Sequence, residues 1–184
     1  MYKSIALSVL AIFFLNSCRE KIEGTGFDEP ANPLPAEPEA WESVEPGFHA
    51  AFGSIDERYE HHLPPPHSPS SGWEGTAWKG ERRNLQIMLW SNETVENIEV
   101  KDFSLEGPGG EVIPAENVGI HPVRYVLTDV FLSGCGWRDK DTIPSSLAAD
   151  ILEYNQAFNL KGQTLRPVWI TIDVPATALA GTYE

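Results

Sequence analysis

The sequence has few basic residues, few cysteines and no long apolar run. Its 184 residues hold 13 lysines and arginines against 27 acidic residues, a formal net charge of −14. Phosphate backbones repel so negative a protein, and we therefore expect no nucleic acid as a partner. The one compact apolar run, Ile5 to Leu15, is far shorter than the ~20 residues that a membrane-spanning helix needs.

This short run belongs to an N-terminal segment that is typical of a bacterial lipoprotein signal peptide. Lys3 supplies the positive charge before the run, and small polar residues follow it up to Cys18. The pattern predicts cleavage after residues 1–17 and acylation of Cys18, which makes membrane lipid a partner through Cys18. The expected location is the bacterial cell envelope, at the outer membrane or the cell surface.

Only two cysteines are present, which limits disulfide chemistry. If Cys18 carries lipid, Cys135 has no partner for an intrachain disulfide. Arg138 but no histidine lies close to Cys135 in the sequence, so we interpret this cysteine as a small core or turn residue rather than a nucleophile.

Residues 18–45 are acidic and rich in proline, with few apolar side chains. Such a segment buries too little apolar surface to offset its chain entropy, which predicts a disordered, extended tether. Its acidic residues form part of an export signal or simply keep the linker solvated; they are Glu20, Glu23, Asp28 and Glu29.

Three histidines, His61, His62 and His67, raise the hypothesis of a metal site, since imidazole is a common ligand. Adjacent histidines diverge on most backbones, and the three prolines of 64–66 hold His67 away from the other two. We therefore expect no metal here and interpret the segment as a rigid surface connection.

The 15 glycines and 15 prolines favour a sheet protein with many turns. Period-two alternation predicts strands, most clearly at 84–90, where Leu85, Ile87 and Leu89 share one face. Further strands are expected over 98–103, 112–113, 118–120, 123–129 and 168–174, whereas 147–158 is expected to hold a helical turn or two. The fold class is therefore all-β, an immunoglobulin-like β-sandwich over residues 46–184.

We expect this sandwich to be incomplete at the C-terminus. Pro175 should end the strand 168–174. Gly181, Thr182 and Tyr183 are similar to the turn that starts the next strand in immunoglobulin-like sandwiches. A strand cut there would leave its neighbour's backbone groups unpaired, so we expect the chain to be the front of a longer protein.

Four motifs in order resemble the N-terminal domain of glycoside hydrolase family 123 and its relatives. They are W-K-G-E-R from Trp78 with Asn84 and Gln86, V-R-Y-V-L-T-D from Val123, Cys135-Gly136, and R-P-V-W-I-T-I-D-V-P from Arg166 continuing to Gly181-Thr182-Tyr183. The resemblance covers residues 41–184. It implies a β-sandwich that precedes a (β/α)8 barrel, and a barrel that hydrolyses terminal β-linked N-acetylgalactosamine. It also implies substrate-assisted retention by an adjacent Asp-Glu pair in that barrel.

A barrel takes roughly 250 residues, and these 184 residues leave no room for one. We therefore expect this chain to be no enzyme by itself, with no catalytic residues, metal or cofactor. The expected function is that of a non-catalytic N-terminal domain of a lipid-anchored carbohydrate-active protein, which supports the barrel.

The candidate contacts to a glycan or to the barrel are Trp90 and Trp169, which lie opposite their strands' aliphatic rows, together with Arg82 and Asp129. Tryptophan stacks on sugars but more often serves a core or an interface. Arg82 and Asp129 could equally form structural ion pairs. The alternative function is a standalone glycan-binding or structural envelope lipoprotein.

Overall fold

The computed structural model describes residues 4–8, 29–66, 70–129 and 145–184. Most of the expected signal peptide lies outside these residues, as do Cys18, Cys135 and His67, together with Trp137, Arg138 and the acidic residues up to Asp28.

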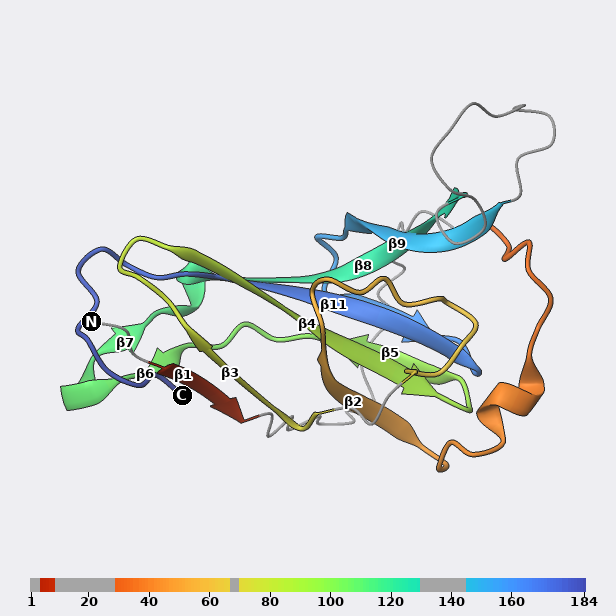
Figure 1. Cartoon of the computed structure of the whole chain (residues 1–184), viewed down its shortest axis with the longest axis horizontal. Helices are drawn as coiled ribbons and strands as arrows, with labels where there is room; N and C mark the ends of the chain where they lie inside the picture. The colour runs from red at the N-terminus through yellow and green to blue at the C-terminus, as the bar shows by residue number, and fades with distance from the viewer. Residues whose placement is uncertain (1–3, 9–28, 67–69, 130–144) are drawn as a thin grey trace.

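The protein is built on one antiparallel sheet of five strands, shown in Figure 1. The strands, in spatial order, are β2 (Phe48–Gly53), β4 (Arg82–Ser91), β11 (Thr164–Asp173), β8 (Val118–Thr128) and β9 (Ser146–Leu152). The expected strands at 84–90 and 168–174 are thus β4 and β11, two of the three interior strands of the sheet. The all-β fold class is confirmed.

A second layer of short two-stranded pieces covers one face of this sheet. It consists of β5 (Val95–Glu99) with β10 (Ala157–Leu160), β6 (Leu105–Glu106) with β7 (Val112–Ile113), and β1 (Ser4–Ser8) with β3 (Gly72–Thr76). Short 3-10 helices occur at η1 (Pro38–Trp41), η2 (Pro108–Gly110) and η3 (Ala115–Asn117).

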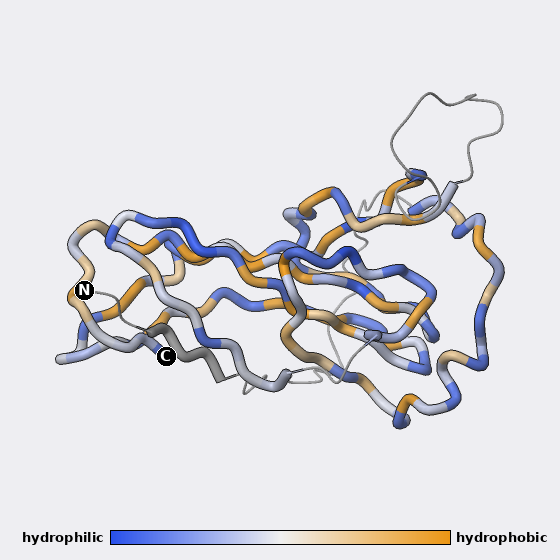
Figure 2. Tube along the Cα trace, viewed as in Figure 1, coloured by the Kyte–Doolittle hydropathy of each residue, from blue (hydrophilic) through white to orange (hydrophobic). Residues whose placement is uncertain are grey.

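The main core lies between these two layers. Leu85 and Leu89 of β4 pack there with the aliphatic row of β11, as the alternation predicts. Ile98, Leu105 and Leu160 close the core from the second layer. Figure 2 shows the corresponding pattern, in which hydrophobic residues alternate with hydrophilic ones along the strands instead of gathering in one run.

The face of β4 opposite Leu85, Ile87 and Leu89 is also buried. Met88 and Trp90 pack with Leu165 under the N-terminal segment, whose Trp41 and Tyr59 are both buried. The period-two pattern of apolar residues did not reveal this second buried face. It placed Met88 and Trp90 on the side of the strand that faces away from the main core. Both faces of β4 therefore carry a layer.

The N-terminal segment that covers this face includes part of the predicted tether. Trp41 is only 2% exposed, and its indole Nε1 donates a hydrogen bond to the carbonyl oxygen of His62 at 2.9 Å. The segment after Tyr59 is also not the expected surface connection, because His62 is buried and the backbone of His61 accepts a hydrogen bond from the Leu165 amide. Packing thus begins before residue 46.

The helical turns expected over 147–158 are wrong: β9 and β10 occupy this range. Of the apolar residues that suggested a helix, Leu147 is buried in β9, whereas Ile151, Leu152 and Tyr154 are 44%, 42% and 84% exposed. Among the described residues, no helix is long and apolar enough to cross a membrane.

The ladder between β8 and β11 stops halfway along β8. It runs from Val118 opposite Ile172 to Pro122 opposite Val168, and from Val123 onward β8 pairs with β9 instead. Proline has no amide hydrogen to donate to a ladder. We call the opening beyond Pro122 the fork of the sheet.

Candidate functional site

The loop before β4 presents a tryptophan to solvent at one end of the molecule. Gly80 has a φ of +76°, a conformation that a glycine adopts without a Cβ penalty. Its amide donates to the carbonyl oxygen of Val174 at 2.9 Å, and the Val174 amide donates back to Glu81 at 2.9 Å. The Glu81 side chain accepts a hydrogen bond from the Trp78 amide at 2.6 Å. The loop is thus fixed, and it leaves the Trp78 side chain 55% exposed.

Beside Trp78 lies an open hollow of about 280 Å³ with mostly apolar walls. Its lining comes from the loop before β4, from β7 and from the C-terminal turn: Ala77, Trp78, Lys79, Ile113, Val174, Ala178, Leu179, Ala180, Gly181 and Tyr183. Leu179 is 53% exposed at its rim. Among its lining residues only Lys79 and Tyr183 are titratable, and no carboxylate or histidine lines it. The hollow can therefore bind an apolar surface or the face of a sugar, but it lacks the carboxylates that glycoside hydrolysis needs.

The predicted site residue Arg82 forms an exposed ion pair. It lies directly opposite Asp173, and its Nε and Nη2 donate to the two carboxylate oxygens at 2.7 and 2.9 Å. The hydrogen bond from Arg82 lowers the pKa of Asp173, and that carboxylate raises the pKa of Arg82. Asp129 follows the other end of the sheet, just past Thr128, so the structure does not bring Arg82 and Asp129 together. Arg82 thus forms an ion pair of the kind named among the alternatives, and its side chain remains 66% exposed.

The two predicted tryptophans lie on the same face of the β4–β11 pair, and Trp90 packs there under the N-terminal segment. Trp90 is 8% exposed and stacks on His49, with ring centroids 5.3 Å apart and an interplanar angle of 17°. Its own chain thus covers the ring that we expected to meet a glycan or a barrel. Trp169 is half-buried, between Gln86 and His121 in the register.

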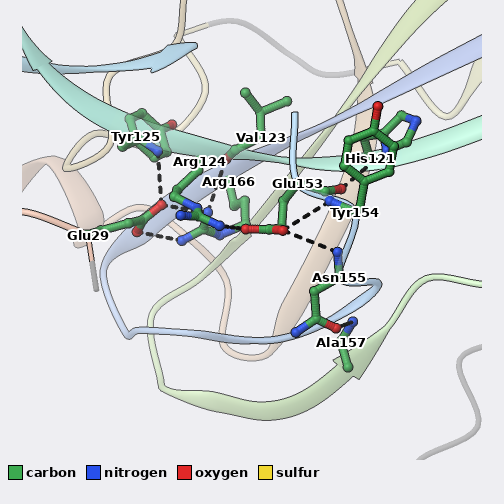
Figure 3. A network of polar contacts seen from close by, with 10 residues as sticks. All are labelled: Glu29, His121, Val123, Arg124, Tyr125, Glu153, Tyr154, Asn155, Ala157 and Arg166. Atoms are coloured by element: carbon green, nitrogen blue, oxygen red, sulfur yellow. Dashed lines mark hydrogen bonds and ion pairs between the residues drawn. The ribbon is translucent and has the colours of Figure 1, made fainter. Parts of the chain in front are cut away.

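A partly buried ion pair fills the fork of the sheet, as Figure 3 shows. Arg166 of β11 holds both carboxylate oxygens of Glu29, at 2.8 and 2.6 Å. The same carboxylate accepts the Tyr125 amide of β8 at 2.9 Å, and Arg166 donates to the carbonyl oxygen of Val123 at 3.0 Å. These side chains satisfy backbone groups of β8 that β11 no longer reaches. Burial alone would raise the pKa of Glu29, but the hydrogen bonds and charge of Arg166 outweigh it and lower that pKa.

Next to this pair, His61 packs edge-on against Tyr125, with ring centroids 4.7 Å apart. Burial is the main cause that lowers the pKa of His61 from 6.5 to about 4, although the charge of Glu29 acts in the opposite direction. Tyr125 is fully buried and its hydroxyl donates to the Tyr59 carbonyl oxygen at 3.2 Å. Burial raises the pKa of this phenol. Glutamate, histidine and tyrosine are residue types used in acid–base catalysis, but here they lie inside the packing.

A second ion pair, Arg124 with Glu153, lies on the other side of the fork (Figure 3). Glu153 also accepts the backbone amides of Tyr154 and Asn155, at 3.0 and 3.3 Å, and so shapes the turn between β9 and β10. No three His, Cys, Asp or Glu residues of the described part of the chain converge as metal ligands do.

Sequence reasoning missed the residues that the geometry singles out. It chose Trp90 and Trp169 because both alternate with aliphatic residues, yet among the tryptophans that the structure describes the most exposed is Trp78, which lies in a loop. The signal was present, since Trp78 precedes a glycine turn outside any apolar alternation. Nothing in the sequence around Glu29 indicated its role, because only the fold brings it next to Arg166, which lies 137 positions away in the chain.

Comparison with known proteins identifies both a family and a fold that the chain shares. Residues 52–184 match the family described as Glycoside hydrolase 123 N-terminal domain. A solved structure, from work on glycolipid glycan hydrolysis by a family 123 glycoside hydrolase of Clostridium perfringens, shares the fold with a TM-score of 0.58 and 20% identity. The match covers 74% of this chain and 23% of that one, so this chain spans about a quarter of its length. No curated protein matches the chain.

Proposed function

Because the chain belongs to the glycoside hydrolase 123 N-terminal domain family, we propose that it is the non-catalytic N-terminal β-sandwich of a lipid-anchored carbohydrate-active protein. In that protein the sandwich supports a (β/α)8 barrel that follows it. The observation that carries the proposal is the family match over residues 52–184, together with the quarter of the Clostridium perfringens structure that the chain spans.

The chemistry of the described residues agrees with a supporting role. Glu29, His61 and Tyr125, which are buried or half-buried, close the fork of the sheet. The hollow beside Trp78 is apolar and holds no paired acid and base. Hydrolysis of a terminal β-linked N-acetylgalactosamine, which the family resemblance implies, is therefore assigned to an Asp-Glu pair of the longer protein.

The first experiment compares the 184-residue chain with the protein encoded by the whole reading frame. We expect the longer protein to release N-acetylgalactosamine from β-linked substrates and the 184-residue chain to release none. Hydrolysis by the 184-residue chain alone would overturn the supporting role. A longer protein without a βα-repeating region would overturn the role of the barrel.

Lipid attachment is tested separately from hydrolysis. Mass spectrometry of the N-terminal peptide of the membrane fraction should find a diacyl or triacyl group on Cys18. The variant Cys18→Ala should lose this mass and leave the membrane fraction. An unmodified Cys18 in the membrane fraction would exclude the anchor. Protection of the chain from added protease in intact cells would exclude the cell surface.

The exposed Trp78 beside an apolar hollow favours glycan binding as the second candidate function. Glycan binding by the 184-residue chain should be lost in Trp78→Ala and kept in Tyr154→Ala, which removes an exposed aromatic ring on another part of the surface. Equal binding by both variants would exclude the hollow as the glycan site.

A further inference from the structure

The face of the five-stranded sheet that points away from the main core changes character along β11. Near the start of the strand, Leu165 packs with Trp90 under the N-terminal segment. Alternate residues of a strand point to the same side, so Trp169, Thr171 and Asp173 share the face of Leu165. All three are half-buried, and none belongs to the buried cluster under the segment. With their neighbours on β4 and β8 they form what we call the open row: Arg82, Asn84, His121, Trp169, Thr171 and Asp173.

The register brings the side chains of the open row next to one another. Thr171 lies opposite Asn84, and its hydroxyl donates to Asn84 Oδ1 at 3.0 Å. His121 lies opposite Trp169 on the other neighbouring strand. Gly119 has no side chain there, and a Cβ on it would lie 3.2 Å from His121 Nε2 and 3.8 Å from the Cβ of Thr171. The imidazole therefore leans over Gly119 toward Thr171, so the row is continuous across three strands.

Three polar groups of the open row have hydrogen-bonding capacity that the fold does not use. His121 Nδ1 lies 3.2 Å from the carbonyl oxygen of Glu153, so Nδ1 donates and Nε2 of the neutral ring is an acceptor. Asn84 uses its oxygen for Thr171, which leaves its Nδ2 as a donor. The indole Nε1 of Trp169 is a further donor. Among the described residues none of these three atoms has a partner, and none is buried from solvent. Two donors and one acceptor thus surround an aromatic ring.

The charges of the open row compensate each other. Arg82 and Asp173 form its last rung and hold each other in a bidentate pair. The remaining members carry no formal charge when His121 is neutral. A net charge of −14 on the whole chain also repels anions. An uncharged ligand with hydroxyl groups and an apolar face fits this row, which is the chemistry of a neutral sugar.

The open row leads to the hollow beside Trp78. One step past the Arg82–Asp173 rung, the Val174 amide donates to Glu81 at 2.9 Å, and Val174 lines the hollow. Gly80, in the loop at this end of the sheet, would have nothing within 4 Å of a Cβ, so the way over the loop is open. Trp169 and Asp173 are four residues apart on one strand, roughly 13 Å. The row and the hollow together are therefore longer than one sugar ring.

We propose that the open row extends the hollow into one binding track for an uncharged oligosaccharide. One sugar occupies the hollow beside Trp78, and the following sugars lie over the row, with a ring stacked on Trp169 and hydroxyls bonded to Asn84 and His121. The inference rests on glycan binding, the second candidate function, and adds the size and charge of the glycan. It requires no catalytic group and no further domain.

The test is calorimetric titration of the 184-residue chain with two probes, followed by NMR. The probes are the methyl β-glycoside of N-acetylgalactosamine and a neutral tetrasaccharide that ends in the same β-linked sugar. The tetrasaccharide should bind at least about fivefold more tightly, because stacking on Trp169 adds to the contact at the hollow. It should also shift the indole Nε1–H signal of Trp169, which the monosaccharide should not. A tetrasaccharide that carries a carboxylate should lose this gain.

Variants assign the gain to the row. Trp169→Ala should bring the affinities for the two probes together, and Trp169→Phe, which keeps a ring, should restore part of the difference. Asn84→Ala tests the row without touching the ring and should reduce the gain. Trp78→Ala should weaken the binding of both probes, because it removes the hollow's aromatic wall.

The outcomes separate this inference from the candidate function on which it rests. Equal affinities for the two probes in the wild type, or a gain that survives in Trp169→Ala, overturns the track and leaves glycan binding at the hollow. Equal gain with the anionic tetrasaccharide overturns the assignment of an uncharged ligand. Absence of binding by either probe overturns glycan binding and the track together. None of these readouts depends on hydrolysis, so the supporting role is tested independently.

Discussion

Two arginine–carboxylate pairs of this protein are both bidentate but have different surroundings. Arg82 and Asp173 form a bidentate pair on the surface, with side chains that are 66% and 46% exposed. Arg166 and Glu29 form the same pair in the fork, with side chains that are 13% and 20% exposed, and they bond the backbone of β8 as well. Exposed ion pairs contribute little to stability, whereas loss of one partner of a buried pair leaves an uncompensated charge.

The variant Glu29→Gln should therefore lower the free energy of unfolding by about 1–3 kcal/mol, because the charge-assisted hydrogen bonds to Arg166 are weakened in a partly dry site. Asp173→Asn, the matched exposed change, should leave stability almost unaltered. Urea unfolding of both variants at pH 7 measures the difference. Equal losses would show that the fork gives Glu29 no special environment.

The half-buried His61 makes stability depend on pH. Its pKa is lowered to about 4, so between pH 6.5 and 4 the unfolded chain binds a proton that the native chain does not. Stability from this residue is complete above pH 6.5 and falls as the pH drops toward 4, by roughly 3 kcal/mol at most. Glu29, with its lowered pKa, adds a further loss once the pH falls below its ordinary value of 4.5.

His61→Gln should flatten the fall in unfolding free energy between pH 6.5 and 4 and leave the steeper loss at lower pH. Urea titrations of the two proteins at half-unit steps of pH provide the comparison. His121→Gln serves as the control, since this half-buried histidine lies outside the His61–Tyr125 contact. A parallel fall in wild type and His61→Gln would contradict the role of His61.

At the scale of the elements, the N-terminal segment belongs to the domain although its composition predicts a tether. Trp41 in η1 is 2% exposed and closes the face that Met88 and Trp90 form. Trp41→Ala should cost about 3–5 kcal/mol of unfolding free energy, the range for large core truncations. Trp78→Ala removes the same side chain from an exposed loop and should cost little. Thermal unfolding of both distinguishes a packed segment from a tether, which would tolerate either change equally.

The turn between β6 and η2 depends on a glycine for space. A Cβ on Gly107 would meet the buried Tyr183 ring at 2.3 Å, so Gly107→Ala should destabilise the protein by about 1–3 kcal/mol through overpacking. Gly119→Ala is the control, because the nearest atom to its Cβ is the end of the His121 side chain at 3.2 Å. A Gly107→Ala variant as stable as Gly119→Ala would place the Tyr183 ring elsewhere.

The sequence predicted those strands in which alternate residues face the main core. Leu85 and Leu89, and the row Val168, Ile170 and Ile172, alternate because one neighbouring layer decides their environment. Leu127 breaks the pattern, since it is 53% exposed although Val123 and Tyr125 before it are buried.

The candidate site was harder to predict because it depends on contacts between distant segments. Whether Trp90 or Trp78 faces solvent is decided by Trp41 and by the C-terminal turn, neither of which is a neighbour in the sequence. The sequence allowed a structural ion pair for Arg82. Its partner, Asp173, could be named only from the register of β4 with β11.

At the scale of the whole molecule, the sheet joins strands that are far apart in the chain. β4 pairs with β11, and β8 pairs with β11 across the intervening β9 and β10. Non-local pairing requires loop closure before contacts form, which slows folding. Refolding followed by tryptophan fluorescence after rapid dilution from urea should therefore take milliseconds to seconds. A complete change within microseconds would contradict this topology.

The position of Glu29 also sets how far the protein extends from its anchor. If Cys18 carries lipid, as proposed, the free length of chain ends at Glu29 because Arg166 holds that residue against the sheet. Eleven peptide units separate the two residues, a maximum reach of roughly 40 Å at full extension. The sandwich would then stay close to the lipid headgroups, within reach of glycans on the membrane that carries it and unable to sample the wider surroundings of the cell.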